Sequence, residues 1–168
     1  MKKSILIVAL LLTGFIFKTA TAQFNVSVRA TNIGVQPVWG PVGYNHVEYY
    51  YMPDIDVYYY VPRHQYIYQQ HGRWVYASNL PSRFHNYDVN NGYKVVINDQ
   101  YPYRHANIYR TKYAEYKGHH DQEIIRNSHD SKYFVIKEHP EHNNWMRNHD
   151  QRDNDHDQRG NDHNHHNQ

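Results

Sequence analysis

The chain has 168 residues, a length typical of one domain or of one domain with a tail. Hydrophobic residues make up 39% of it, and it contains no cysteine. The absence of cysteine excludes disulfide bonds, thiolate metal sites and cysteine nucleophiles. The most unusual constituents are 18 tyrosines and 15 histidines.

Residues 1–22 have the pattern of a secretory signal peptide. Two lysines precede an apolar run over 5–17, and the sequence Ala-Thr-Ala stands immediately before Gln23. The apolar run is shorter than the roughly 20 residues that a transmembrane helix needs. We therefore expect cleavage, no stable membrane span afterwards, and export of a bacterial protein to the periplasm, the outer surface or the medium.

Without residues 1–22 the formal charge changes sign. The remaining chain holds 15 Lys and Arg residues against 16 Asp and Glu residues, a net charge of −1 in place of +2. Proteins that bind nucleic acids present a clustered basic face, and this sequence contains no such cluster. We expect no nucleic-acid partner.

Composition divides the rest of the chain into a body, residues 23–137, and a tail, residues 138–168. The body contains all 18 tyrosines, whereas the tail contains seven histidines, seven asparagines and seven acidic residues. Trp145 and Met146 are the only large apolar residues of the tail. Such a segment buries too little apolar surface to offset its chain entropy, so we predict that it is disordered.

The body has the composition of a β protein. Leu80 is the only leucine after residue 22, and Val, Ile and Tyr supply most of the apolar residues. Alternation and turn residues predict strands over 24–29, 46–52, 55–61, 65–69, 73–77 and 93–98, a helix over 107–117 capped by Asn107, and weaker elements over 121–127 (helical) and 133–137 (strand). The expected fold is mainly β: a small antiparallel meander of short strands with one or two short helices, then the disordered tail.

Alternation within the strands predicts one aliphatic and one aromatic sheet face. Aromatic rings stack on sugars and are enriched in interfaces, so the aromatic face is a candidate platform for polysaccharide or protein. The competing interpretation is that the same rings form the core, because one leucine cannot fill it. The sequence leaves both interpretations open for the six candidate residues, Tyr58, Tyr60, Tyr66, Tyr68, Trp74 and Tyr76.

These tyrosine-rich motifs also support a family resemblance. The segments Glu48-Tyr49-Tyr50-Tyr51, Val57-Tyr58-Tyr59-Tyr60, Gln65-Tyr66-Ile67-Tyr68 and Gly72-Arg73-Trp74-Val75 resemble those of small exported tyrosine-rich proteins of Bacteroidota-type bacteria. The resemblance covers residues 40–137 and implies export. It implies no activity and no functional residues.

The sequence contains no recognisable catalytic motif. It has no nucleophile elbow, no zinc-protease motif, no phosphate-binding glycine loop and no calcium loop. The densest ionisable cluster of the body, His119-His120-Asp121 with Glu123, could bind a metal or transfer protons, or form a solvated linker. We therefore expect a protein that is not an enzyme.

The histidines of the tail are candidate ligands for Zn, Ni or Cu, because neutral imidazole is a common ligand for these metals. The alternative is a solubilising tail, and the sequence does not decide between them. The main functional prediction is a non-enzymatic exported binding or structural protein of the bacterial envelope. Periplasmic binding or sequestration of divalent metal is the alternative, with no other cofactor expected and the oligomeric state left open. The candidate metal ligands of this alternative are His149, His156, His163, His165 and His166.

Overall fold

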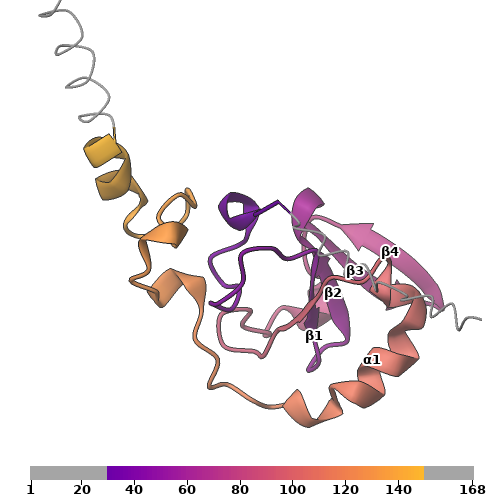
Figure 1. Cartoon of the computed structure of the whole chain (residues 1–168). Coiled ribbons are helices and arrows are strands. Elements are labelled where there is room, and N and C mark those ends of the chain that lie inside the picture. Colours follow the sequence, from indigo (N-terminus) through magenta and orange to yellow (C-terminus); the bar gives the residue numbers. More distant parts are fainter. Residues whose placement is uncertain (1–29, 150–168) are drawn as a thin grey trace, which may run out of the picture.

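The computed structural model describes residues 30–149, which contain a five-stranded antiparallel sheet (Figure 1). The order across the sheet is β4-β3-β2-β1-β5, so the first four strands form a meander and β5 pairs with the free edge of β1. This confirms the predicted mainly β fold. The predicted strand over 24–29 and the segment 1–22 lie outside the described residues. The strands are β1 (Tyr49–Met52), β2 (Val57–Tyr60), β3 (Gln65–Gln70), β4 (Arg73–Ala77) and β5 (Val95–Ile97).

Tight turns connect the meander where the sequence places Pro, Gly, Asp and His. His71 and Gly72 join β3 to β4 with φ values of 49° and 72°. Two consecutive residues of positive φ match the twist of a two-residue hairpin, which explains why this connection is so short. The turn between β1 and β2 ends at Asp56, which also has a positive φ, of 53°.

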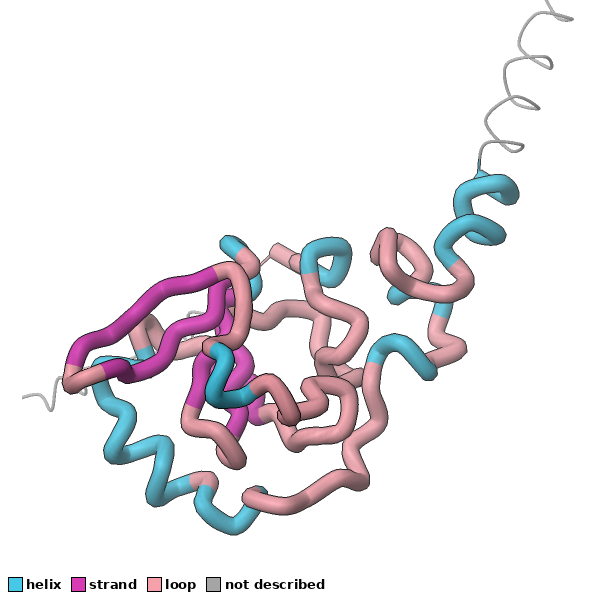
Figure 2. The backbone as a smooth tube through the Cα atoms, turned by 180° about the vertical axis from the view of Figure 1, so that it is seen from behind, coloured by secondary structure: helices cyan, strands magenta, loops and turns pink. Residues whose placement is uncertain are grey.

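The α-helix and the 3-10 turn after it follow β5 in sequence and run below the sheet in the views of Figures 1 and 2. Helix α1 (Ala106–Lys112) is shorter than predicted and is followed by a 3-10 turn at Ala114–Tyr116. Its N-cap position is His105, without a side-chain cap, so the predicted cap at Asn107 is wrong. The helix is held by packing of its buried Ala106 and Tyr109 against the sheet.

Two shorter predictions have different outcomes. Residues Ile125–Asn127 form a 3-10 turn within the region expected to be helical. The strand predicted over 133–137 is absent, because a 3-10 turn at Ser131–Tyr133 is followed by further turns. Tyr133 and Ile136 are both buried, a spacing of three that suits a helical turn and not a strand.

Both faces of the sheet carry tyrosines, so the prediction of one aliphatic and one aromatic face is wrong. Tyr58 pairs with Ile67 across β2 and β3, while Tyr59 pairs with Tyr66. Tyr58 and Tyr60 therefore share a face with Ile67, and Tyr66 lies on the opposite face. Alternation identifies the two sides of one strand. The turn sets the register between two strands, and the register decides which of their side chains share a face.

The core consists of one cluster on each sheet face and a third beside it. On one face, the rings of β1 and β2 pack against Tyr103 and against α1. On the other, Tyr50 and Tyr59 pack against Trp39 and Tyr87 from the loops. The third cluster joins Val38 to Ile125, Tyr133 and Ile136, so the first and the last parts of the described chain lie side by side.

Backbone pairing reinforces that third cluster. The amide of Ile125 donates to the carbonyl of Gly40 at 2.8 Å, and the amide of Arg126 donates to the carbonyl of Val38 at 2.8 Å. Beyond these turns the described chain ends in a helix over 142–149 that points away from the sheet (Figure 1). Among residues 30–149, no helix has the length and the apolar character needed to cross a bilayer.

The described order continues past residue 137, where we predicted that the disordered tail begins. His139 is only 4% exposed, and its Nε2 atom lies 3.2 Å from the carbonyl oxygen of Ser128. Its ring also packs on Phe134, with centroids 4.9 Å apart. The predicted boundary is therefore too early, because the polar composition hid a histidine that the fold buries. Residues 150–168 of the predicted tail lie outside the described residues.

Candidate ligand groove

Two adjoining pockets open where β1 and β2 meet the loop after β5. The larger has a volume of about 610 Å³ and the smaller about 160 Å³, and both are lined by Tyr49, Tyr60 and Tyr101. We call the two pockets together the tyrosine groove. The larger pocket adds Ala30, His46, Glu48, Asn98, Asp99 and Gln100, and the smaller adds Arg63, Gln65, Ile67, Tyr76 and Tyr103.

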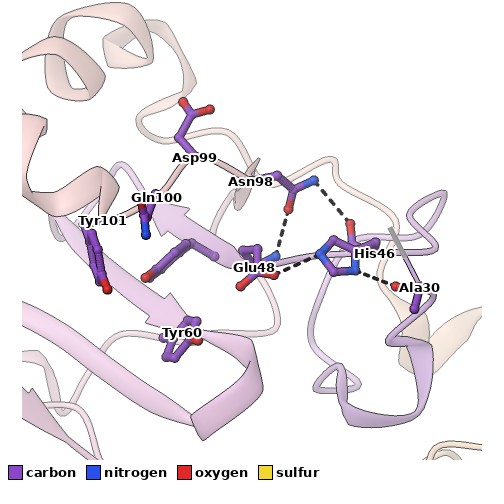
Figure 3. Close-up of a pocket in the computed structure, with 9 residues that line it drawn as sticks. Ala30, His46, Glu48, Tyr60, Asn98, Asp99, Gln100 and Tyr101 are labelled. Carbon is purple, nitrogen blue, oxygen red and sulfur yellow. Dashed lines mark hydrogen bonds and ion pairs between the residues drawn. The ribbon is translucent and has the colours of Figure 1, made fainter. Parts of the chain in front are cut away.

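One wall of the groove is a polar network (Figure 3). The Nε2 atom of His46 lies 3.0 Å from Oε1 of Glu48, and its Nδ1 atom lies 2.8 Å from the carbonyl oxygen of Ala30. The side-chain oxygen of Asn98 accepts a hydrogen bond from the Glu48 amide at 2.8 Å. The network fixes a carboxylate, an amide and an imidazole around the mouth of the larger pocket.

The floor of the groove is aromatic. The rings of Tyr49 and Tyr60 lie on paired positions of β1 and β2 and stack with centroids 4.8 Å apart and an interplanar angle of 26°. Burial raises the pKa of Tyr49, so its hydroxyl stays protonated throughout the physiological range and can donate a hydrogen bond. Tyr76, which is 51% exposed, donates from its hydroxyl to that of Tyr103 at 2.9 Å.

Tyr101 stands at the junction of the two pockets in an uncommon backbone conformation. Its φ is 51°, in the left-handed region that bulky residues rarely occupy, and its side chain is 41% exposed. The guanidinium of Arg104 lies 4.6 Å from the ring centroid. Conformations of this kind concentrate at functional sites, because the surrounding structure must offset their cost.

The remaining carboxylate of the groove is tied to α1. The hydroxyl of Tyr109 donates to Oδ2 of Asp99 at 2.6 Å. Burial, and then this contact with Asp99, raise the pKa of Tyr109 to about 12. The hydrogen bond connects the loop after β5 to the helix and so stabilises one side of the groove.

The six candidate platform residues do not form one surface. Tyr60 and Tyr76 line the groove, and Trp74 supports it from behind, with its ring centroid 5.4 Å from that of Tyr103. Tyr58 is fully buried on the same face. Tyr66 and Tyr68 belong to the opposite face, where Tyr66 packs against Tyr59 and Tyr68 lies beneath the guanidinium of Arg83.

Sequence reasoning missed Tyr49, Tyr101 and the polar wall. These residues come from segments far apart in the chain, and the pairing of β5 with β1 brings them together. One signal was present: the polar run from Asn98 to Gln100, followed by Tyr101, begins at the end of the strand predicted over 93–98. Loops that follow a strand are frequent positions for binding residues.

The candidate metal ligands are only partly described. His149 lies on the helix over 142–149 and is exposed, whereas His156, His163, His165 and His166 lie outside the described residues. In the body cluster, Nδ1 of His119 lies 3.8 Å from an oxygen of Asp121, and both side chains are at least half exposed. Within residues 30–149, no three His, Asp or Glu side chains are grouped so that they could hold a metal ion.

Comparison of the chain with models of known protein families, with curated proteins and with solved structures returned no match. The resemblance to exported tyrosine-rich proteins therefore stays a prediction.

Proposed function

We propose that the protein is a non-enzymatic exported binding protein of the bacterial envelope, and that the tyrosine groove binds a chain of envelope polysaccharide. The observation that carries this proposal is the continuity of the groove. Two pockets share three tyrosine rings, and amide and carboxylate groups line their walls. Stacked rings with hydrogen-bonding groups around them suit a ligand that has apolar ring faces and polar edges.

The charge of the lining favours a neutral glycan over a strongly charged ligand. Glu48 and Asp99 line the larger pocket, and Arg63 lines the smaller one. Glu48 is in contact with His46 and Asp99 accepts a hydrogen bond from Tyr109, so part of the hydrogen-bonding capacity of both carboxyl groups is used within the protein. What remains available to a ligand is mainly aromatic surface, the Gln65 and Gln100 amides, and tyrosine hydroxyls.

The same contacts support binding without cleavage. Glycosidases use one carboxylic acid that is available to protonate the leaving oxygen and a second carboxyl group across the bond. In the groove, one oxygen of Glu48 contacts His46, and one oxygen of Asp99 accepts the Tyr109 hydroxyl. In each carboxyl group, one oxygen is therefore already engaged within the protein.

Binding of purified glycans tests the proposal. The mature chain should bind insoluble peptidoglycan or a neutral envelope polysaccharide in sedimentation assays, without releasing soluble sugar. Tyr101→Ala and Tyr76→Ala should each weaken binding by about tenfold, the equivalent of about 1.4 kcal/mol. Tyr44→Ala is the matched control, because Tyr44 is also 41% exposed and lies outside the lining of the groove.

Three results would contradict the proposal. Equal weakening by Tyr44→Ala would mean a general loss of exposed aromatic surface. Absence of binding to every envelope glycan would reject the ligand class, and release of reducing sugar would reject a non-enzymatic role. Export has its own test. The intact mass of the protein recovered from the periplasm or medium should correspond to a chain that begins at Gln23.

A further inference from the structure

Tyr93 and Tyr116 form a stacked pair of rings away from the tyrosine groove, which neither of them lines. Their ring centroids lie 4.5 Å apart, and their planes are inclined by only 10°. Among the tyrosine pairs of residues 30–149, this one is both the closest and the most nearly parallel. Two phenol rings are therefore held face to face at a place that the proposed function does not use.

The segments that carry the two rings are also joined by contacts that do not involve the rings. The side chain of Gln122 accepts a hydrogen bond from the amide of Lys94 at 2.9 Å and donates one to the carbonyl oxygen of Lys94 at 2.9 Å. The Nδ1 atom of His120 lies 3.3 Å from the carbonyl oxygen of Asn91. Because these contacts fix the chain on either side, loss of one tyrosine hydroxyl should leave the two rings in place.

The pair differs from the other close tyrosine pairs in access and in freedom to move. Both rings are half-buried, so a small oxidant in solution can reach them. Tyr93 precedes β5 and Tyr116 ends the 3-10 turn after α1, so neither belongs to a strand ladder. Two stacked rings must tilt and approach each other before they can form a bond, and loops permit this movement. The next closest pairs lie on paired positions of β1 and β2, where the ladder fixes the backbone: Tyr49 with Tyr60, and Tyr51 with Tyr58.

Oxidation can join two such rings without any other reactive group of the protein. Loss of one electron and the phenolic proton converts a tyrosine to a phenoxyl radical, whose unpaired electron is shared by the ring carbons next to the hydroxyl-bearing carbon. Two radicals couple through these carbons, and the hydrogen on each carbon moves to the oxygen of its own ring. With hydrogen peroxide as the oxidant, two ring C–H bonds break, one C–C bond forms, and the peroxide is reduced to two molecules of water.

We propose that Tyr93 and Tyr116 are a site of oxidative cross-linking, at which a peroxidase-type oxidant supplied with hydrogen peroxide joins the two rings within one chain. The bond connects the start of β5 to the turn after α1 and closes residues 94–115 into a loop. Closing a loop lowers the conformational entropy of the unfolded chain and so stabilises the fold. Small extracellular domains often obtain this effect from disulfide bonds, which a chain without cysteine cannot form.

The test is treatment of the dilute mature chain with a haem peroxidase and hydrogen peroxide, followed by tryptic digestion and mass spectrometry. The product should stay monomeric and contain peptide 84–94 joined to peptide 113–117, with the summed mass less two hydrogen atoms. Tyr93→Phe and Tyr116→Phe should each abolish the joined peptide, although phenylalanine keeps a ring in the stack. Tyr113→Phe is the matched control and should leave the yield unchanged, because Tyr113 is also half-buried and its ring lies 6.2 Å from that of Tyr116.

Urea denaturation gives the second readout, since the cross-linked chain should unfold at a higher midpoint than the untreated chain. A joined peptide that survives in the Tyr93→Phe or Tyr116→Phe variant would overturn the proposal, because Tyr87 or Tyr113 would then supply the bond. Covalent dimers without the joined peptide, an absence of coupling, or an unchanged midpoint would also overturn it. Glycan binding is a separate measurement, so failure of the cross-link and failure of the tyrosine groove are distinguishable.

Discussion

Tyr51 on β1 and Tyr58 on β2 face each other with ring centroids 4.8 Å apart, and both side chains are fully buried. Their hydroxyls differ in one respect. The hydroxyl of Tyr51 donates to Oδ1 of Asp56 at 3.1 Å, whereas that of Tyr58 has no hydrogen-bond partner among the described residues. An unpaired buried hydroxyl costs free energy, so two neighbouring and equally buried rings contribute differently to stability.

Replacement of each tyrosine by phenylalanine should therefore have opposite effects. Tyr58→Phe removes an unpaired hydroxyl and should raise the free energy of unfolding by about 1 kcal/mol. Tyr51→Phe removes a hydrogen bond to a carboxylate and should lower it by about 1–2 kcal/mol. Urea denaturation of the two variants is the measurement, and equal shifts of the two midpoints would contradict this account.

Trp74 is the candidate residue that best tests whether the aromatic rings form the core or a ligand-binding surface. Its half-buried ring packs against Tyr58 and Tyr103, at centroid distances of 6.1 Å and 5.4 Å. Trp74→Ala should lower the free energy of unfolding by about 2–4 kcal/mol, and Trp74→Phe by clearly less. A loss below about 1 kcal/mol together with weaker glycan binding would show a surface platform instead.

Truncation should locate the true end of the folded unit. Removing residues 138–168 deletes His139 and its contacts with Ser128 and Phe134, and should lower the free energy of unfolding by about 1–3 kcal/mol. Removing only 150–168 keeps those contacts and should leave it nearly unchanged. Thermal unfolding of the two truncated chains tests this, and equal melting temperatures would restore the earlier boundary at residue 137.

Lys94 should make stability rise with pH on the alkaline side of neutrality. Its side chain is 1% exposed, and burial lowers its pKa to about 8, although Asp88 opposes the shift. Between pH 8 and about 10.5 the unfolded chain binds the extra proton, so the free energy of unfolding should increase, by on the order of 2–3 kcal/mol. Lys94→Met should flatten this rise, whereas Lys117→Met, at an exposed position, should not.

The buried tyrosines set the upper end of the pH range in which the fold is stable. Burial raises the pKa of Tyr50, Tyr58 and Tyr59, and raises that of Tyr109 to about 12. Their stabilising contribution is complete below about pH 10, the pKa of tyrosine in the unfolded chain, and is lost as the pH rises toward the folded-state values. The part of the tyrosinate absorbance at 295 nm that comes from these buried tyrosines should therefore appear cooperatively with loss of the fold, and its gradual appearance in a folded chain would contradict this.

Local signals predicted the fold well where neighbouring residues determine structure. Strand β4 has the predicted bounds, because alternating Trp74, Val75 and Tyr76 follow a turn of His71 and Gly72. The relation between strands could not be predicted in this way, since the turns decide whether Tyr66 joins the face of Tyr58 or that of Tyr59. The prediction of two sheet faces therefore failed although all five strands of the sheet lie within or near predicted segments.

The residues of the tyrosine groove could be predicted only in part, because some of them are brought together by pairing between distant strands. Tyr60 and Tyr76 were among the candidate residues because strand alternation selected them, but Tyr49 and Tyr101 depend on the pairing of β5 with β1. Burial of His139 likewise depends on Ser128 and on Phe134, which lies in the segment predicted as a strand over 133–137. Contacts between distant segments carry the information that composition and periodicity lack.

The pairing of Gly40 with Ile125, and the packing of Val38 on Tyr133 and Ile136, have a consequence for the order of events during synthesis. The segment that leaves the ribosome early finds its partners only after almost the entire body has followed. Contacts of such long sequence separation form slowly, so the nascent chain stays incompletely folded until late. If the protein is exported as we propose, this delay would keep the chain unfolded enough for translocation until folding is completed after transport.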